Sequence, residues 1–417
     1  MNNQVIIFAR EELNKYLEKL SVNAEISLGL FNEFDVEMEL NDPCYDDAYV
    51  ISVKDKKGFI AGSNERSVLF GVYRLLEEWG ITWVRPGPNG TNYPKECTCD
   101  NIEIKEAADT RHRIMCVEGA ISIENALDMI EWLPKVGFNG YYIQPNKAHE
   151  YFENWYNHQM STVKQPEQYT VEQTEEYVKL ISVEIEKRGL YTYADDSKIR
   201  NDHIISDQIF DAGGEAIARI VHKDIQNFDD SALNGFTVCQ LQRNAFPSSI
   251  VMTTIAKTLW NHNTNFQKLR CDLYAAAFGK YSVETTTDYF ALLSKAFDIE
   301  VIHGQKQFNA SEFKANLEAA ITAMEYLEFY VNRKFWEIGD SDPCQKDSWV
   351  YLNIHRKIYT FLARSLIAKI NGEFKKAEEY LKKSQEIAFE NEDILQPVFD
   401  CMFYAKITNE NINLLNT

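Results

Sequence analysis

The stretch Arg-His-Arg-Ile-Met-Cys-Val-Glu-Gly at residues 111–119 decides the fold that we predict for this chain. An apolar run, Ile114–Val117, ends at Glu118, and apolar residues at helical spacing follow from Ile123. A strand that ends in a polar residue and leads into a helix is typical of the first unit of a (β/α)8 barrel. The active sites of such barrels lie at the C-terminal ends of their strands. The stretch therefore predicts a barrel entrance and places Glu118 at the ligand-binding face.

Three more strands are predicted after this one, at residues 140–144, 190–194 and 235–240. Strands and helices alternate here, which favours parallel βα units over hairpins. Four strands within residues 111–240 fall well short of the roughly 250 residues that a complete eight-stranded barrel occupies. We therefore predict a shortened, incomplete TIM-type (β/α) barrel over residues 106–250.

The segments on either side predict two further domains, so the expected fold class is multidomain, α/β plus α. Residues 1–105 contain a strand at Val5–Ala9, a hairpin at 48–62 and a helix that ends at Gly80, which together indicate a small α+β domain. Residues 251–417 show apolar residues at helical spacing in several long stretches. We interpret this last part as a helical C-terminal domain.

The composition excludes several classes of partner. The chain carries 63 acidic and 43 basic residues, a net charge of −20, which repels phosphate groups, so neither nucleic acid nor a membrane is expected as a partner. The N-terminus lacks the pattern of a secretory signal, and no apolar run approaches the roughly 20 residues that span a bilayer. Eight scattered cysteines favour a reduced, cytoplasmic location. Assembly into a homo-oligomer stays open.

No sequence pattern indicates a metal or a cofactor. Cys97-Thr-Cys99 is the one close cysteine pair, and neither a second pair of cysteines nor a histidine pair accompanies it. The GxGxxG, Walker and nucleophile-elbow motifs are absent from the sequence. We therefore expect no metal and no cofactor.

Three segments together resemble bacterial alpha-glucuronidase-like and beta-hexosaminidase-like glycosidases. Residues 58–87 are similar to the small domain that precedes the barrel in those enzymes, and residues 111–144 are similar to their first two βα units. Residues 234–261 resemble the last strand and the entry to the helical domain. The resemblance implies a carbohydrate ligand and hydrolysis of an O-glycosidic bond in a uronic-acid or amino-sugar oligosaccharide. It fails near residues 194–203, where relatives would have the middle strands that carry the catalytic acid and its partner.

Glycoside hydrolysis generally needs two carboxyl groups on either side of the scissile bond. Glu118 ends the first predicted strand and is one candidate, although an ion pair with Arg111 or Arg113 would equally explain a carboxylate there. Asp195 and Asp196 follow the third strand and are the other catalytic candidates. Adjacent carboxylates raise one another's pKa, but aspartate is also common in helix caps and loops.

Five residues on or near the predicted strands are the expected substrate contacts: Arg113, Gln144, Tyr193, Gln240 and Arg243. Amide and guanidinium groups bind sugar hydroxyls, and Arg243 can bind a uronic carboxylate in a bidentate manner. A structural role in holding loops explains these residues equally well.

Two functions follow from these observations. The first is a glycoside-hydrolase-like protein of carbohydrate metabolism that acts on or binds carbohydrate. The alternative is a catalytically inactive, truncated relative that serves as a carbohydrate-binding or protein-interaction scaffold. The missing middle strands favour loss of the family's activity.

Overall fold

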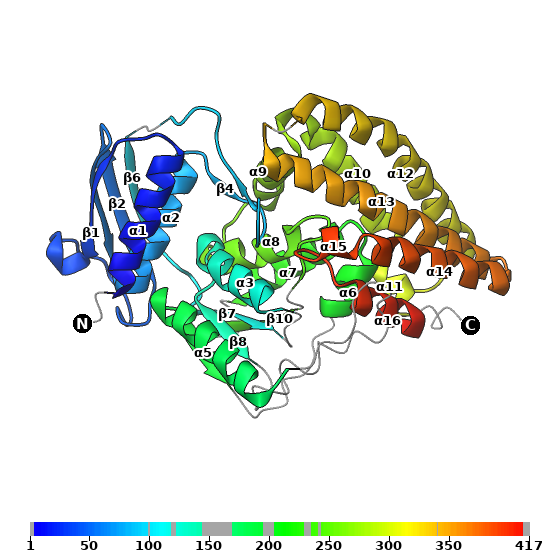
Figure 1. Ribbon diagram of the computed structural model, residues 1–417, viewed down its shortest axis with the longest axis horizontal. Coiled ribbons are helices and arrows are strands. Elements are labelled where there is room, and N and C mark those ends of the chain that lie inside the picture. The colour runs from blue at the N-terminus through cyan, green and yellow to red at the C-terminus, as the bar shows by residue number, and fades with distance from the viewer. Residues whose placement is uncertain are drawn as a thin grey trace.

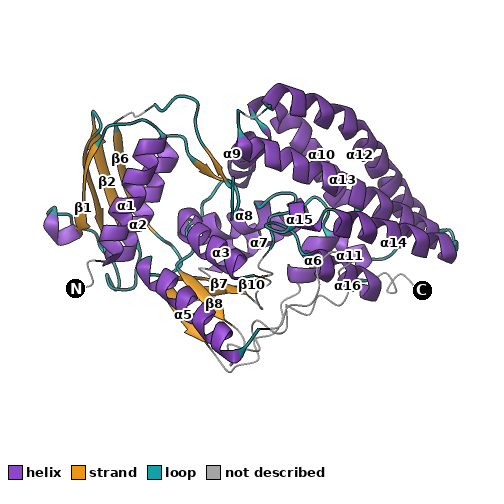
Figure 2. Cartoon of the chain, viewed as in Figure 1, coloured by secondary structure: helices purple, strands orange, loops and turns teal. Residues whose placement is uncertain are grey.

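The computed structural model describes residues 4–98, 101–117, 122–143, 169–194, 204–228, 235–240, 243–339 and 341–411 of the chain. Within these residues the protein is mixed α/β, with an N-terminal sheet, a second sheet near the centre and a helical C-terminal region (Figure 1). Figure 2 shows that the strands lie in the N-terminal and central parts, whereas the remainder is helical.

The N-terminal sheet has four strands in the order β1-β3-β2-β6. Strand β1 (Glu25–Leu30) is parallel to β3 (Lys57–Gly62), and β2 (Ala48–Lys54) runs antiparallel to both β3 and β6 (Ile102–Ala107). The helices on this sheet are α1 (Gln4–Lys19) and α2 (Glu65–Glu78), and both lie on the side that faces the rest of the molecule in Figure 1. A separate pair of short strands, β4 (Thr82–Trp83) and β5 (Thr91–Asn92), follows α2 in the sequence.

Helix α1 corrects one prediction. A strand was expected at Val5–Ala9 because the run is rich in β-branched residues, but the helix already begins at Gln4. Val5, Phe8 and Ala9 are buried together with Leu13, three to four residues apart along the helix. Burial of this helical face outweighs the strand propensity of the run, as tertiary context commonly does.

The central sheet consists of the four predicted strands, all parallel, in the order β10-β7-β8-β9. Their bounds are β7 (His112–Val117), β8 (Gly140–Ile143), β9 (Tyr191–Ala194) and β10 (Gly235–Gln240). Gln240 pairs with Val117, Val117 with Ile143, and Ile143 with Ala194, so all four strands end on one line. In the described part of the chain this sheet stays open and forms no closed barrel.

Both faces of the central sheet are buried, as is usual for parallel strands. Met115, Val117, Tyr141 and Val238 belong to the main core, which also includes residues of α3 (Ile123–Val136) and α5 (Val171–Lys187). Ile114, Cys116, Tyr142 and Cys239 form a separate small apolar cluster. Side chains alternate between the faces along a strand, so this second cluster lies on the opposite face.

Helices α6 (Ile204–Phe210) and α7 (Glu215–Gln226) precede β10, and the helical region follows it. Its helices are α8 (Ile250–Trp260), α9 (Phe266–Phe278), α10 (Val283–Ala296), α11 (Ile299–Ile302), α12 (Ala310–Ile338), α13 (Pro343–Ile370), α14 (Phe374–Glu390), α15 (Glu392–Leu395) and α16 (Cys401–Asn411). Among the described residues no helix is both long and apolar enough to cross a membrane.

Asp47 connects the N-terminal sheet to the central sheet. Its carboxylate is fully buried and accepts hydrogen bonds from Arg66 Nε at 2.9 Å, from an Arg113 amino group at 2.7 Å and from Asn139 Nδ2 at 2.8 Å. Burial alone would raise the pKa of Asp47, but the two guanidinium groups lower it to about 2. The carboxylate is therefore ionised and fixes the strand start of β7 against α2.

Candidate functional site

The C-terminal edge of the central sheet is where the sequence places the site. Four of the predicted site residues lie outside the described residues: Glu118, Gln144, Asp195 and Asp196. Tyr193 and Gln240 lie on β9 and β10, and only the backbone of these two residues is described. Their roles in catalysis and binding stay predictions.

Arg113 lies in the interface between the two sheets. Its side chain is fully buried, and besides Asp47 it donates to the carbonyl oxygens of Gly137 and Thr110, each at 2.7 Å. The guanidinium also lies over the Trp260 ring, 4.8 Å from the centroid. These contacts give Arg113 a structural role, which the sequence left open as the alternative to substrate binding.

Arg243 lies in the wall of a cavity close to the end of β10. Three segments line this cavity, namely residues 208–214 at and just after the end of α6, residues 243–251 between β10 and the first turn of α8, and residues 398–400 before α16. The cavity has a volume of about 40 Å³, enough for roughly three water molecules. Arg243 is three residues beyond the last residue of β10, so the cavity adjoins the predicted ligand-binding edge.

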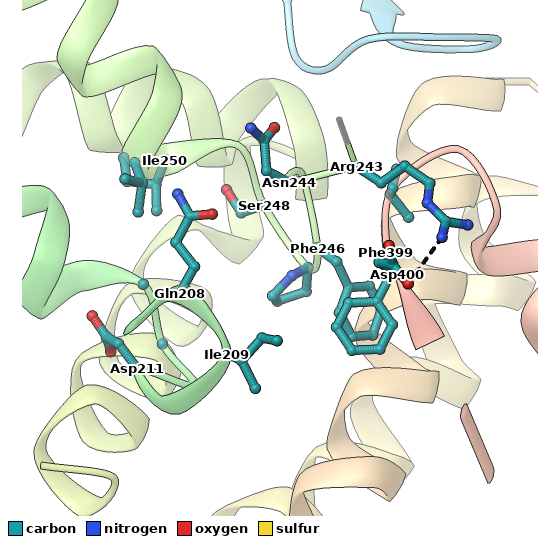
Figure 3. Close-up of a pocket in the computed structure, with 15 residues that line it drawn as sticks. Gln208, Ile209, Asp211, Arg243, Asn244, Phe246, Ser248, Ile250, Phe399 and Asp400 are labelled. Carbon is teal, nitrogen blue, oxygen red and sulfur yellow. Dashed lines mark ion pairs between the residues drawn. The ribbon is translucent and has the colours of Figure 1, made fainter. Parts of the chain in front are cut away.

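Three polar groups in this cavity are buried without a hydrogen-bond partner in the described part of the chain: Gln208 Nε2, Arg243 Nε and Ser248 Oγ. Figure 3 shows the side chains of Gln208 and Ser248 turned toward the same part of the cavity. An unpaired buried polar group costs about 1–3 kcal/mol. Such a group in a cavity wall therefore favours a ligand that supplies its hydrogen bond.

The charge of Arg243 is neutralised within the cavity wall. One of its terminal amino groups lies 3.1 Å from Asp400 Oδ1, and the two side chains are 2% and 4% exposed (Figure 3). The same carboxylate oxygen accepts the backbone N–H of Phe403 at 2.9 Å, at the start of α16. Because Asp400 neutralises Arg243, the cavity offers polar contacts without a net positive charge.

Asp211, a second carboxylate in the wall, has a structural role. It accepts the backbone N–H of Ile217 at 2.9 Å and the hydroxyl of Ser294, and both contacts hold the start of α7. Burial raises the pKa of Asp211, and these hydrogen bonds oppose the rise. Its hydrogen-bonding capacity is directed away from the cavity, as Figure 3 also shows.

Aromatic rings form the apolar side of the cavity. The centroids of Phe246 and Phe399 lie 4.4 Å apart, and the imidazole of His355 packs at 5.3 Å from Phe246. His355 is fully buried, and burial lowers its pKa to about 3, so the ring is neutral at ordinary pH. The cavity thus combines neutral polar groups with an apolar wall, the usual composition of a small-molecule site.

A larger groove lies between α2, α3, α8 and α9, with a volume of about 730 Å³. Its charged side chains neutralise each other, as in the pairs Lys257–Glu77 and Lys268–Asp272, both at 2.6 Å. It borders the C-terminal end of α3, which leads to the start of β8, so it lies away from the strand ends. The paired charges and this position make it a weaker candidate than the cavity.

Sequence reasoning found Arg243 and missed its neighbours. Arg243 was nominated because it follows the last predicted strand. Gln208 lies on a short helix and Asp400 in the helical region, and no motif connects either of them to β10. Only the fold brings these three side chains together.

Comparisons with known proteins add little to this geometry. No known protein family matches the sequence, and no curated protein matches it. Among solved structures, CpGH84D, a glycoside hydrolase family 84 enzyme, matches over 97% of this chain and 94% of its own, with 11% sequence identity and a TM-score of 0.36. A match of this strength establishes neither a shared fold nor a shared activity, so the resemblance to glycosidases stays a prediction.

Proposed function

We propose that this protein binds a carbohydrate at the C-terminal edge of the central sheet, with the cavity around Arg243 as one subsite. The observation that carries the proposal is the set of unpaired polar groups on Gln208, Arg243 and Ser248 beside the rings of Phe246 and Phe399. Sugars present hydroxyl and amide groups next to apolar C–H faces, so they complement both kinds of surface.

The size and charge of the cavity narrow the ligand. A space of about 40 Å³ fits one sugar substituent of three or four non-hydrogen atoms. Asp400 already neutralises Arg243, and Asp211 adds a further acidic group to the wall, so an anionic uronate carboxylate is disfavoured there. A neutral acetamido or hydroxymethyl group fits better. We therefore favour an amino sugar over a uronic acid.

Hydrolysis of a glycosidic bond is the second candidate function, and the strand register favours it. Val117 and Ala194 end β7 and β9 on one line, with β8 between them, and two strand spacings amount to about 10 Å. Glu118 and Asp195 are the next residues in the sequence. Carboxyl groups about 6.5–9.5 Å apart are typical of inverting glycosidases. In this proposal Glu118 and Asp195, which directly follow the first and third strands in the sequence, supply the two carboxylates.

Two assays separate these functions. Ligand-observed NMR with N-acetylhexosamines, neutral hexoses and glucuronate detects binding, and we expect signals from the N-acetylhexosamines. Aryl glycosides and oligosaccharides, followed by product anomer analysis, detect hydrolysis with inversion. Glu118→Gln and Asp195→Asn should each abolish turnover, and Asp196→Asn tests the neighbouring carboxylate. Turnover unaffected by all three changes would refute the catalytic assignment, and binding without turnover identifies an inactive binder.

A further inference from the structure

The outer surface of α12 carries three aromatic side chains that contact little else. Tyr326, Phe329 and Trp336 are 73%, 76% and 91% exposed. The opposite side of α12 is buried through Phe313, Leu317, Ala320, Met324, Leu327 and Val331. The helix is therefore anchored by one apolar side and presents a second, aromatic side to solvent. Figure 1 shows α12 at the outer edge of the helical region.

The three rings form a row along the helix. Phe329 and Trp336 are seven residues apart, which places them on the same line of the helix about 10 Å apart along its axis. Tyr326 lies one turn before Phe329, so the row extends over about 15 Å. The two intervals differ, about 4.5 Å from Tyr326 to Phe329 and about 10 Å from Phe329 to Trp336, and all three rings lie on the exposed side of a single helix.

The charges around the row are compensated. Three glutamates near the rings are each paired with a basic side chain: Glu325 with Arg364, Glu328 with Arg356, and Glu337 with both Arg333 and Lys334. In a chain whose net charge is −20, this surface is close to neutral. It therefore suits an uncharged ligand, and the paired groups still offer hydrogen bonds at the sides of the rings.

Two features argue against a second copy of the chain as the occupant. Each copy carries a charge of −20, so two copies repel each other at low ionic strength. In addition, the large apolar side chains exposed on α12 are all aromatic, with no exposed leucine, isoleucine, valine or methionine in the described helix. Interfaces between copies of one chain are more broadly apolar.

We propose that the row Tyr326–Phe329–Trp336 binds a neutral polysaccharide chain by stacking its rings on sugar units along that chain. The flat faces of the aromatic rings match the C–H faces of sugars, and a linear ridge matches an extended polymer. The proposal shares the carbohydrate ligand class of the proposed function, but it depends on residues of α12 instead of the cavity. Each proposal can therefore fail without the other.

The test is affinity electrophoresis of the full-length protein in gels that contain hydroxyethylcellulose, xylan, soluble starch or the anionic polymer polygalacturonate. We expect at least one neutral polymer to retard the wild-type protein, and polygalacturonate to retard it less. The double variant Phe329→Ala/Trp336→Ala should show at least tenfold weaker retardation. Both substitutions are on the surface, so folding is preserved, which circular dichroism checks.

Two controls make the result specific. Phe374→Ala removes an aromatic side chain of α14 that is 60% exposed, and it should leave retardation unchanged. Ser248→Ala alters the cavity and should also leave retardation unchanged. Equal retardation of the double variant and the wild type, or no retardation by any neutral polymer, would overturn the proposal. A wild-type dimer in sedimentation that the double variant abolishes would instead make the row a self-association surface.

Discussion

Asp47 and Arg113 are 66 residues apart in the sequence, yet their side chains meet at 2.7 Å in the buried interface between the two sheets. Arg66 binds the same carboxylate from α2, and its guanidinium also donates to the carbonyl oxygen of Gly189 at 3.0 Å, just before β9. One carboxylate thus pairs with two buried guanidinium groups. This arrangement fixes the orientation of the central sheet and of the edge at which its strands end.

We predict that Asp47→Asn destabilises the protein by about 3–5 kcal/mol, because it leaves two buried guanidinium groups without a counter-charge. Urea-induced unfolding measures the change. Asp46→Asn is the matched control, since Asp46 forms a partly exposed pair with Arg111 that is worth about 1 kcal/mol or less. Equal losses for the two variants would contradict the role of Asp47.

His355 predicts a dependence of stability on pH. Its pKa is about 3 in the folded protein and about 6.5 when unfolded, so below pH 6.5 protons bind the unfolded chain preferentially. Stability is therefore present above pH 6.5 and is lost as the pH falls toward 3. The loss from this residue is about 2 kcal/mol between pH 7 and pH 5.

The measurement compares the wild type with His355→Leu by urea unfolding at both pH values. The difference between the two proteins at pH 7 contains the packing cost of the substitution. The variant should lose about 2 kcal/mol less than the wild type on going to pH 5. If both proteins lost the same free energy of unfolding between pH 7 and pH 5, His355 would have to be protonated within the folded protein.

Two adjacent serines test whether the cavity has unpaired polar groups. Ser248 Oγ is buried without a partner in the described residues, so Ser248→Ala should leave the stability of the ligand-free protein unchanged or raise it by up to about 1 kcal/mol. Ser249 is the control, because its hydroxyl donates to the carbonyl oxygen of Val84, and Ser249→Ala should cost about 1–2 kcal/mol. A comparable loss for Ser248→Ala would mean that its hydroxyl supports the fold.

The sequence predicts most of the strands and helices discussed above, but it does not predict the long-range contacts between them. The four central strands were predictable because each is a short apolar run next to a helical pattern, as β7 illustrates. At Val5–Ala9 a short apolar run rich in β-branched residues led to the prediction of a strand. That prediction was wrong, because the buried residues of this segment have helical spacing. Local pattern cannot show which distant segment completes a core.

The candidate site was predictable only in part. Arg243 was found because it follows the last strand, but its partner Asp400 lies in the helical region, and Gln208 lies before β10. Arg113 was predicted from its position next to the first central strand, but its partner Asp47 directly precedes β2 of the N-terminal sheet. Charge pairs of this kind depend on how the sheets and helices pack together, which neither spacing nor composition records.

The most direct test of carbohydrate binding in the cavity is isothermal titration calorimetry with N-acetylglucosamine, N-acetylgalactosamine and glucuronate. We predict that an N-acetylhexosamine binds and that glucuronate binds at least roughly tenfold more weakly, because Asp400 already neutralises Arg243. Gln208→Leu and Ser248→Ala should each weaken the binding by roughly tenfold. Gln305→Leu, at an exposed position, should leave it unchanged. Tighter binding of glucuronate, or binding that is indifferent to Gln208 and Ser248, would contradict the proposed site.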